Sequence, residues 1–108
     1  MIQNSNMAHI KIADTFFQKL FGLMFKKDCT YHLLLKKCTS IHTFFMFFNI
    51  DCVFLDKANN VISIRTHIQP GHIIIGPLGT HSIIELKTNR ETTKIYSIGL
   101  HVPIPNVL

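Results

Sequence analysis

The amino-acid sequence predicts a small, mainly β protein of the α+β class, and three observations lead to that prediction. The chain has 108 residues, of which 47% are hydrophobic and 16% charged, so a disordered chain is excluded and one compact domain over residues 1–108 is expected. Segments rich in β-branched and aromatic residues alternate with clusters of Pro, Gly and Asn, as strands alternate with turns. One short segment near the N-terminus instead has helical spacing.

The first part of the chain predicts a strand, a short helix and a second strand. Residues 7–13 alternate between apolar and polar side chains, which is typical of a half-buried strand. Asp14 or Thr15 can cap a following helix, in which four apolar residues recur at helical spacing, and Gly22 is a stop signal. Residues 31–37 contain four good strand formers with weak alternation, and they predict a second strand.

The clearest local signal predicts an antiparallel hairpin. Apolar segments 52–56 and 61–68 flank a polar connection at 57–60, which has a usual length for a hairpin loop. We expect Asn60 to lie at or near a position of positive φ. Alternation in the second arm predicts that one face carries Ile62, Ile64, Thr66 and Ile68.

The remaining segments predict two more strands and an ambiguous end. Residues 73–75 form a short apolar segment between two turns, and residues 82–87 again have strand character. Residues 88–93 are polar and predict a turn. Residues 94–100 fit either one helical turn or a strand, and the two prolines of the tail 102–105 exclude a central strand there.

The candidate site lies in the segment from Cys38 to Met46. In an extended backbone, Cys38, Ser40 and His42 point to one face because they are two residues apart. The aromatic residues that follow are more typical of a core, but beside Ser40 and His42 they could also form a small-molecule pocket.

Two other chemistries are compatible with this segment. An enzyme could use Cys38 or Ser40 as nucleophile, His42 as base and Asp51 to orient the base. Cys38 and His42 could instead share a metal ion, but zinc needs four ligands, or three and a water. A single closely spaced pair is too few, so we expect no metal and no cofactor.

Charge and length restrict the partners. The net charge of +5 favours acidic partners such as nucleic acid or anionic lipid surfaces, but the lysines are scattered in pairs along the chain. The apolar runs are far shorter than the roughly 20 residues of a spanning helix, so we expect no membrane partner. Three cysteines without a CxxC pair and the absence of an export signal predict a cytoplasmic protein with reduced thiols.

The central motif resembles a known family. Residues 40–46 read Ser-Ile-His-Thr-Phe-Phe-Met and residues 50–56 read Ile-Asp-Cys-Val-Phe-Leu-Asp, with Gly-Leu-Met at 22–24 and Ile-Glu-Leu at 84–86. Together these segments resemble the domain of unknown function 192 family over about residues 10–102. The resemblance implies a curled antiparallel sheet or partly open β-barrel with a short N-terminal helix, and no established activity.

Five positions depart from that family's usual pattern. Lysines replace arginines, which removes the planar contacts of a guanidinium, and asparagines replace turn glycines, a tolerable exchange at positive φ. A leucine follows Gly99 where the family commonly has an aspartate, so a function that relied on that carboxylate would be lost. The five positions are Lys19, Lys26, Asn60, Asn89 and Leu100.

We therefore expect a binding or accessory module for an unidentified small molecule or protein, with an enzyme as the alternative and a nucleic-acid binder third. The predicted binding face comprises Cys38, Ser40, His42, Thr43, Phe45, Met46 and Asp51, supported by Glu85 and Lys19.

Overall fold

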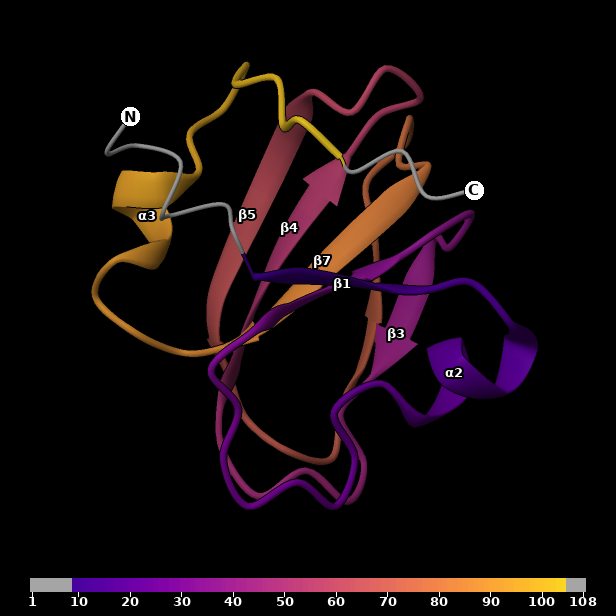
Figure 1. Ribbon diagram of the computed structural model, residues 1–108, viewed down its shortest axis with the longest axis vertical. Coiled ribbons are helices and arrows are strands. Elements are labelled where there is room, and N and C mark those ends of the chain that lie inside the picture. Colours follow the sequence, from indigo (N-terminus) through magenta and orange to yellow (C-terminus); the bar gives the residue numbers. More distant parts are fainter. Residues whose placement is uncertain (1–8, 105–108) are drawn as a thin grey trace.

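An open five-stranded sheet forms the centre of the protein, as a computed structural model that describes residues 9–104 shows (Figure 1). The strand order is β1-β2-β7-β4-β5, and every neighbouring pair except β1 and β2 is antiparallel. The strands are β1 (Ile10–Ala13), β2 (His32–Leu35), β7 (Ser82–Lys87), β4 (Ile50–Leu55) and β5 (Val61–Ile68).

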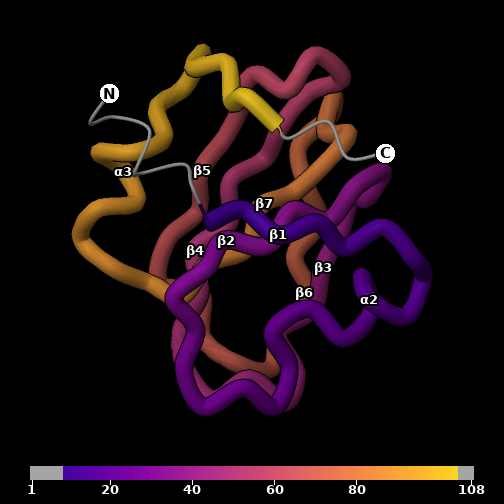
Figure 2. The backbone as a smooth tube through the Cα atoms, viewed as in Figure 1, coloured from indigo at the N-terminus to yellow at the C-terminus, as the bar shows by residue number. Residues whose placement is uncertain are grey.

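A two-stranded ribbon and two short helices complete the fold. Strands β3 (Ser40–His42) and β6 (Ile73–Ile75) pair antiparallel, and the helices are α2 (Phe16–Phe21) and α3 (Thr92–Ile95). Figures 1 and 2 show α2 beside the β3 end of the molecule and α3 on the opposite flank. None of the helices in the described part of the chain is long and apolar enough to cross a bilayer.

Apolar clusters cover both faces of the sheet. One contains Ile50, Cys52 and Phe54 together with Ile41 and Ile74 of the ribbon. The other packs Val53 and Leu55 against Tyr96 and Val102 near the C-terminus. Because both faces are covered, every residue of β4 is buried, which explains the apolar run at residues 52–55.

The mainly β, α+β class with a short N-terminal helix is confirmed, and the structure adds one feature that the sequence does not predict. Strand β1 pairs in parallel with β2, with Ile10 opposite His32. The α2 crossover between them makes this possible, because parallel neighbours need a connection longer than a hairpin turn. Residues 7 and 8 of the expected first strand lie outside the described residues.

The β4–β5 hairpin is confirmed, but one detail of its prediction is wrong. Positive φ occurs at Asn59, at 66°, next to Asn60 as expected. Two register shifts interrupt the pairing of β5 with β4, so strict alternation fails. Ile62 and Ile68 therefore pack on one face of the sheet, whereas Ile64 packs on the other.

The α2 helix begins where the sequence predicts, but its apolar side chains are exposed. The Thr15 hydroxyl accepts a hydrogen bond from the Gln18 backbone N–H in a capping box. No residue of α2 is buried. A single helical turn, α3, begins at Thr92, within the segment 88–93 predicted as a turn, and ends at Ile95, early in the ambiguous segment 94–100, which also contains a turn at Gly99.

Candidate functional site

A groove between α2 and the β3–β6 ribbon holds four of the predicted site residues. Its volume is about 380 Å³, within the size range of small-molecule pockets. Most of its surface is apolar, with an amine, a thiol, a hydroxyl and an imidazole among the lining groups. The lining residues are Phe16, Lys19, Leu20, Cys38, Ser40, Ile41, His42 and Ile73.

The ribbon forms one wall of the groove because its side chains alternate. Ile41 and its partner Ile74 are buried, so they anchor the ribbon on the sheet. Ser40 and His42 therefore face outward, and the register places Ile73 opposite His42. The predicted common face of Ser40 and His42 is thus present in the structure.

His42 joins the ribbon to α2 and uses both ring nitrogens to do so. Its Nε2 lies 2.7 Å from the Leu20 carbonyl oxygen, and its Nδ1 accepts from the Phe44 backbone N–H at 3.1 Å. A carbonyl can only accept and an N–H can only donate, so the ring is the neutral form protonated on Nε2. Neither nitrogen is free to act as a base.

Cys38 is a neutral thiol at the edge of the groove. Its Sγ donates to the Ser40 carbonyl oxygen at 3.0 Å. Burial raises the pKa of this thiol above its usual value, and the nearby Lys19 ammonium offsets only part of that rise. A raised pKa disfavours the thiolate that a nucleophile or a metal ligand requires.

Lys19 carries the one positive charge among the residues that line the groove. Its Nζ donates to the Lys36 carbonyl oxygen at 3.0 Å, which holds the ammonium between α2 and the end of β2. An ammonium has three donors, so two remain for a bound molecule.

The other predicted site residues lie away from the groove. Thr43 is buried, where its Oγ1 donates to the Gln69 carbonyl and accepts from the His72 N–H, each at 2.8 Å. Met46 is buried in the core, and Phe45 is exposed on a different surface.

Asp51 is also buried, on β4. Its Oδ1 accepts from the His67 backbone N–H at 2.9 Å and from the Thr88 hydroxyl at 2.7 Å. His67 lies at a φ of 57° in the irregular part of β5. The carboxylate therefore fixes the strand irregularity and does not orient His42.

Glu85 lies on the central strand β7, beneath the end of α2. Its Oε1 is buried without a hydrogen-bond partner, and a methyl group at Gly22 would lie 2.8 Å from it. Burial raises the pKa of this carboxyl to about 8, and a backbone hydrogen bond from Leu23 only partly opposes the rise. Glu85 is therefore mostly neutral at pH 7.

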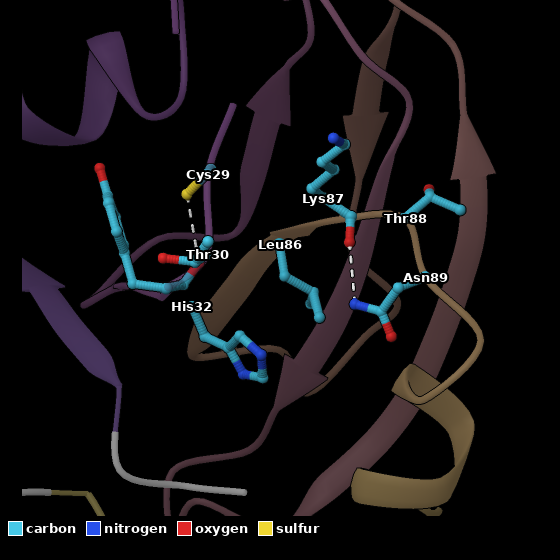
Figure 3. A pocket seen from close by; sticks show the side chains of 8 residues that line it. Cys29, Thr30, His32, Leu86, Lys87, Thr88 and Asn89 are labelled. Carbon is cyan, nitrogen blue, oxygen red and sulfur yellow. Dashed lines mark hydrogen bonds between the residues drawn. The ribbon is translucent and has the colours of Figure 1, made fainter. Parts of the chain in front are cut away.

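A second cavity, of about 280 Å³, lies between residues 29–32 and 86–89 (Figure 3). Some of its polar groups bond within the chain: the Cys29 thiol donates to the Tyr31 carbonyl at 3.3 Å, and the Asn89 amide donates to the Lys87 carbonyl at 3.2 Å. Lys87 in turn pairs with Asp28. None of the predicted site residues lines this cavity, and its surface is less apolar than that of the groove.

The sequence did not identify the apolar lining of the groove. Phe16 and Leu20 are four residues apart on α2, a spacing that usually indicates a core face. Ile73 was recognised only as part of a short strand. The pairing of β3 with β6, about thirty residues apart, brings these side chains together, and no local pattern encodes that pairing.

All three cysteines are free thiols. Within residues 9–104, no three His, Cys, Asp or Glu side chains lie close enough to share a metal ion.

The fold and groove define a small β-rich protein with an open sheet and a groove between a helix and a two-stranded ribbon. The chain belongs to the DUF192 family, described as "Uncharacterized ACR", whose model matches residues 1–100.

Archaeal relatives support this membership. A UPF0127 protein of Pyrococcus horikoshii is 38% identical over 82 residues, which are 70% of this chain and 70% of the relative. A UPF0127 protein of Thermococcus sibiricus is 35% identical over 82 residues, which are 70% of this chain but only 53% of the relative. The chain thus spans about half the length of that relative.

Two solved structures share the fold. A protein of unknown function from Novosphingobium aromaticivorans has a TM-score of 0.73 at 14% identity, covering 83% of this chain and 70% of its own. A protein from Sinorhizobium meliloti, described as a putative transcription regulator, has a TM-score of 0.74 at 17% identity, covering 83% of this chain and 76% of its own.

Proposed function

We propose that this protein is a cytoplasmic binding or accessory module that holds a small amphipathic molecule in the groove between α2 and β3. The observation that carries the proposal is the combination of apolar walls with one ammonium, that of Lys19, at their edge. A molecule with a short apolar chain and one carboxylate matches that combination. Three free thiols support the cytoplasmic setting.

The geometry supports binding better than nucleophilic catalysis. Cys38 donates its proton to a backbone carbonyl and not to His42, and both His42 nitrogens are already bonded. An activated nucleophile needs a base within hydrogen-bond reach, and this arrangement provides none for Cys38.

Octanoate and octanol provide the test, because they share a chain and differ in charge. We expect saturable shifts in the ¹H–¹⁵N spectrum at Leu20, Ser40 and Ile73 with both, and tighter binding of octanoate. Lys19→Met keeps the apolar stem but removes the ammonium and its bond to the Lys36 carbonyl. Octanoate affinity should therefore fall about tenfold more than octanol affinity, the effect of one lost charged contact of about 1.4 kcal/mol.

Lys94→Met is the matched control, because Lys94 is exposed on α3, away from the groove, and pairs with Glu91. It should leave both affinities unchanged. Shifts that stay linear with concentration, or that spread evenly over the protein, would rule out the groove as a binding site.

A further inference from the structure

Seven of the nine phenylalanines are exposed, and three of them form a cluster on two neighbouring loops. The side chains of Phe25, Phe45 and Phe47 are 58%, 64% and 61% exposed. Phe25 stacks on Phe45 with ring centroids 5.5 Å apart and lies 6.5 Å from Phe47. These three residues are called the aromatic tip below.

The aromatic tip lies at one end of the molecule and is held there by the backbone. The Phe25 N–H donates to the Phe45 carbonyl at 3.0 Å, which ties loop 22–31 to loop 43–49. Figures 1 and 2 show these loops together at the lower end, opposite the β4–β5 turn. None of the three rings lines the groove or the other four cavities described for residues 9–104.

Two members of the aromatic tip have a strained backbone. Phe25 and Phe45 have φ values of 63° and 62°, a region in which a bulky side chain is an outlier. Strain of this kind persists where the surrounding structure imposes it and is concentrated at functional sites. Here the strained residues carry two apolar rings that are exposed to water, so burial of the rings does not offset the strain.

Positive charge adjoins the rings. Residues 15–27 contain three lysines and no Asp or Glu, and residues 43–49 contain no Asp, Glu, Lys or Arg. Lys26 and Lys27 directly follow Phe25 and are exposed. The next residue, Asp28, pairs with Lys87 at 2.8 Å, so its charge is compensated.

We propose that the aromatic tip docks on an anionic lipid surface, with the rings at the level of the headgroups and acyl chains and with Lys26 and Lys27 on the anionic headgroups. Weak apolar insertion and a basic patch together give stable peripheral binding where either alone is marginal. A second copy of the chain fits less well because it would bring the same lysines. A nucleic-acid base fits less well because Phe25 and Phe45 already stack on each other. Peripheral docking of this kind needs no spanning segment.

Sedimentation with vesicles tests the proposal. We expect the protein to partition at least tenfold more onto vesicles of 70% phosphatidylcholine and 30% phosphatidylserine than onto pure phosphatidylcholine. Salt at 0.5 M should reverse most of that difference, because it screens surface charge. Partition onto both vesicle types to the same extent, or onto neither, would overturn the proposal.

The variants separate the rings from the charges. Phe25→Gly with Phe45→Gly removes both rings and places glycine at positive φ, so the fold should persist, as circular dichroism will verify, while vesicle binding falls at least tenfold. Lys26→Gln with Lys27→Gln should reduce binding several-fold. Lys57→Gln with Lys94→Gln makes the same charge change away from the aromatic tip and should alter binding less than twofold.

Three results would contradict docking on lipid. The glycine variant could bind vesicles as well as the unchanged protein. A single-stranded oligonucleotide could bind in place of vesicles and be lost in that variant, which would favour nucleic acid. A concentration-dependent dimer that disappears in the variant would assign the surface to a second copy. The vesicle, oligonucleotide and dimer measurements do not depend on octanoate binding in the groove, so failure of one proposal can be distinguished from failure of the other.

Discussion

Glu85 is a residue whose burial makes the protein sensitive to pH. The carboxyl has a pKa of about 8 in the folded protein and 4.5 as its ordinary value, which the unfolded chain restores. A raised folded-state pKa gives stability that is fully present below about pH 4.5. That stability is lost as the pH rises towards about 8, because the unfolded chain releases the proton first.

Glu85→Gln should remove this pH dependence, because the amide keeps the size of the neutral carboxyl at every pH. Between about pH 5 and 8, the unfolding free energy of the unchanged protein should fall relative to the variant by about 1.4 kcal/mol per pH unit. Urea melts of both proteins at pH 5, 6, 7 and 8 measure the difference between their unfolding free energies. Both proteins contain the same histidines, so the contribution of the histidines cancels in that difference. Parallel curves would show that Glu85 is ionised in the folded protein.

The position of α2 depends on hydrogen bonds and not on burial of its side chains. None of its residues is buried, so helix packing contributes little. Its Thr15 cap, the Lys19 bond to the Lys36 carbonyl and the His42 bond to the Leu20 carbonyl hold it instead. An element held by a few exposed hydrogen bonds is expected to open locally before the core unfolds.

His42→Ala and Phe54→Ala should therefore act on different elements. Loss of His42 removes two hydrogen bonds near solvent and should cost about 1 kcal/mol, with faster amide exchange confined to α2 and residue 44. Loss of the fully buried Phe54 leaves a cavity in β4 and should cost about 3–5 kcal/mol. Denaturant melts and hydrogen exchange distinguish the two. Equal costs would mean that α2 belongs to the cooperative core.

For the whole molecule, local pattern predicted the strands well and long-range pairing poorly. Residues 61–68 could be identified from sequence alternation, and residues 82–87 from their aliphatic residues, with turn residues between the strands. The parallel β1–β2 pair and the β3–β6 ribbon could not, because they depend on contacts between distant segments. The site prediction has the same limit. Alternation in β3 predicted that Ser40 and His42 share one face, but no local pattern showed that Asp51 and Thr43 are buried, where their hydrogen bonds hold the backbone.

The Cys52 thiol can report on unfolding of the whole molecule. It is fully buried in β4, and burial raises its pKa well above the usual value. With Cys29→Ser and Cys38→Ser in place, we expect a thiol reagent to label Cys52 only through global opening. The logarithm of the labelling rate should then rise with urea with the slope of the equilibrium unfolding curve. Rapid labelling without urea would reveal local separation of β4 from its neighbours.

The two register shifts in β5 also bear on whether this protein pairs with other chains at high concentration. Strand β5 is an edge of the main sheet, and a long regular edge is a template for pairing with another chain. The shifts bend that edge, Arg65 and His67 are exposed on it, and the Leu100 carbonyl accepts from the Val61 N–H at its start. We therefore expect this edge to resist pairing with a second chain, although many phenylalanines are exposed elsewhere on the protein.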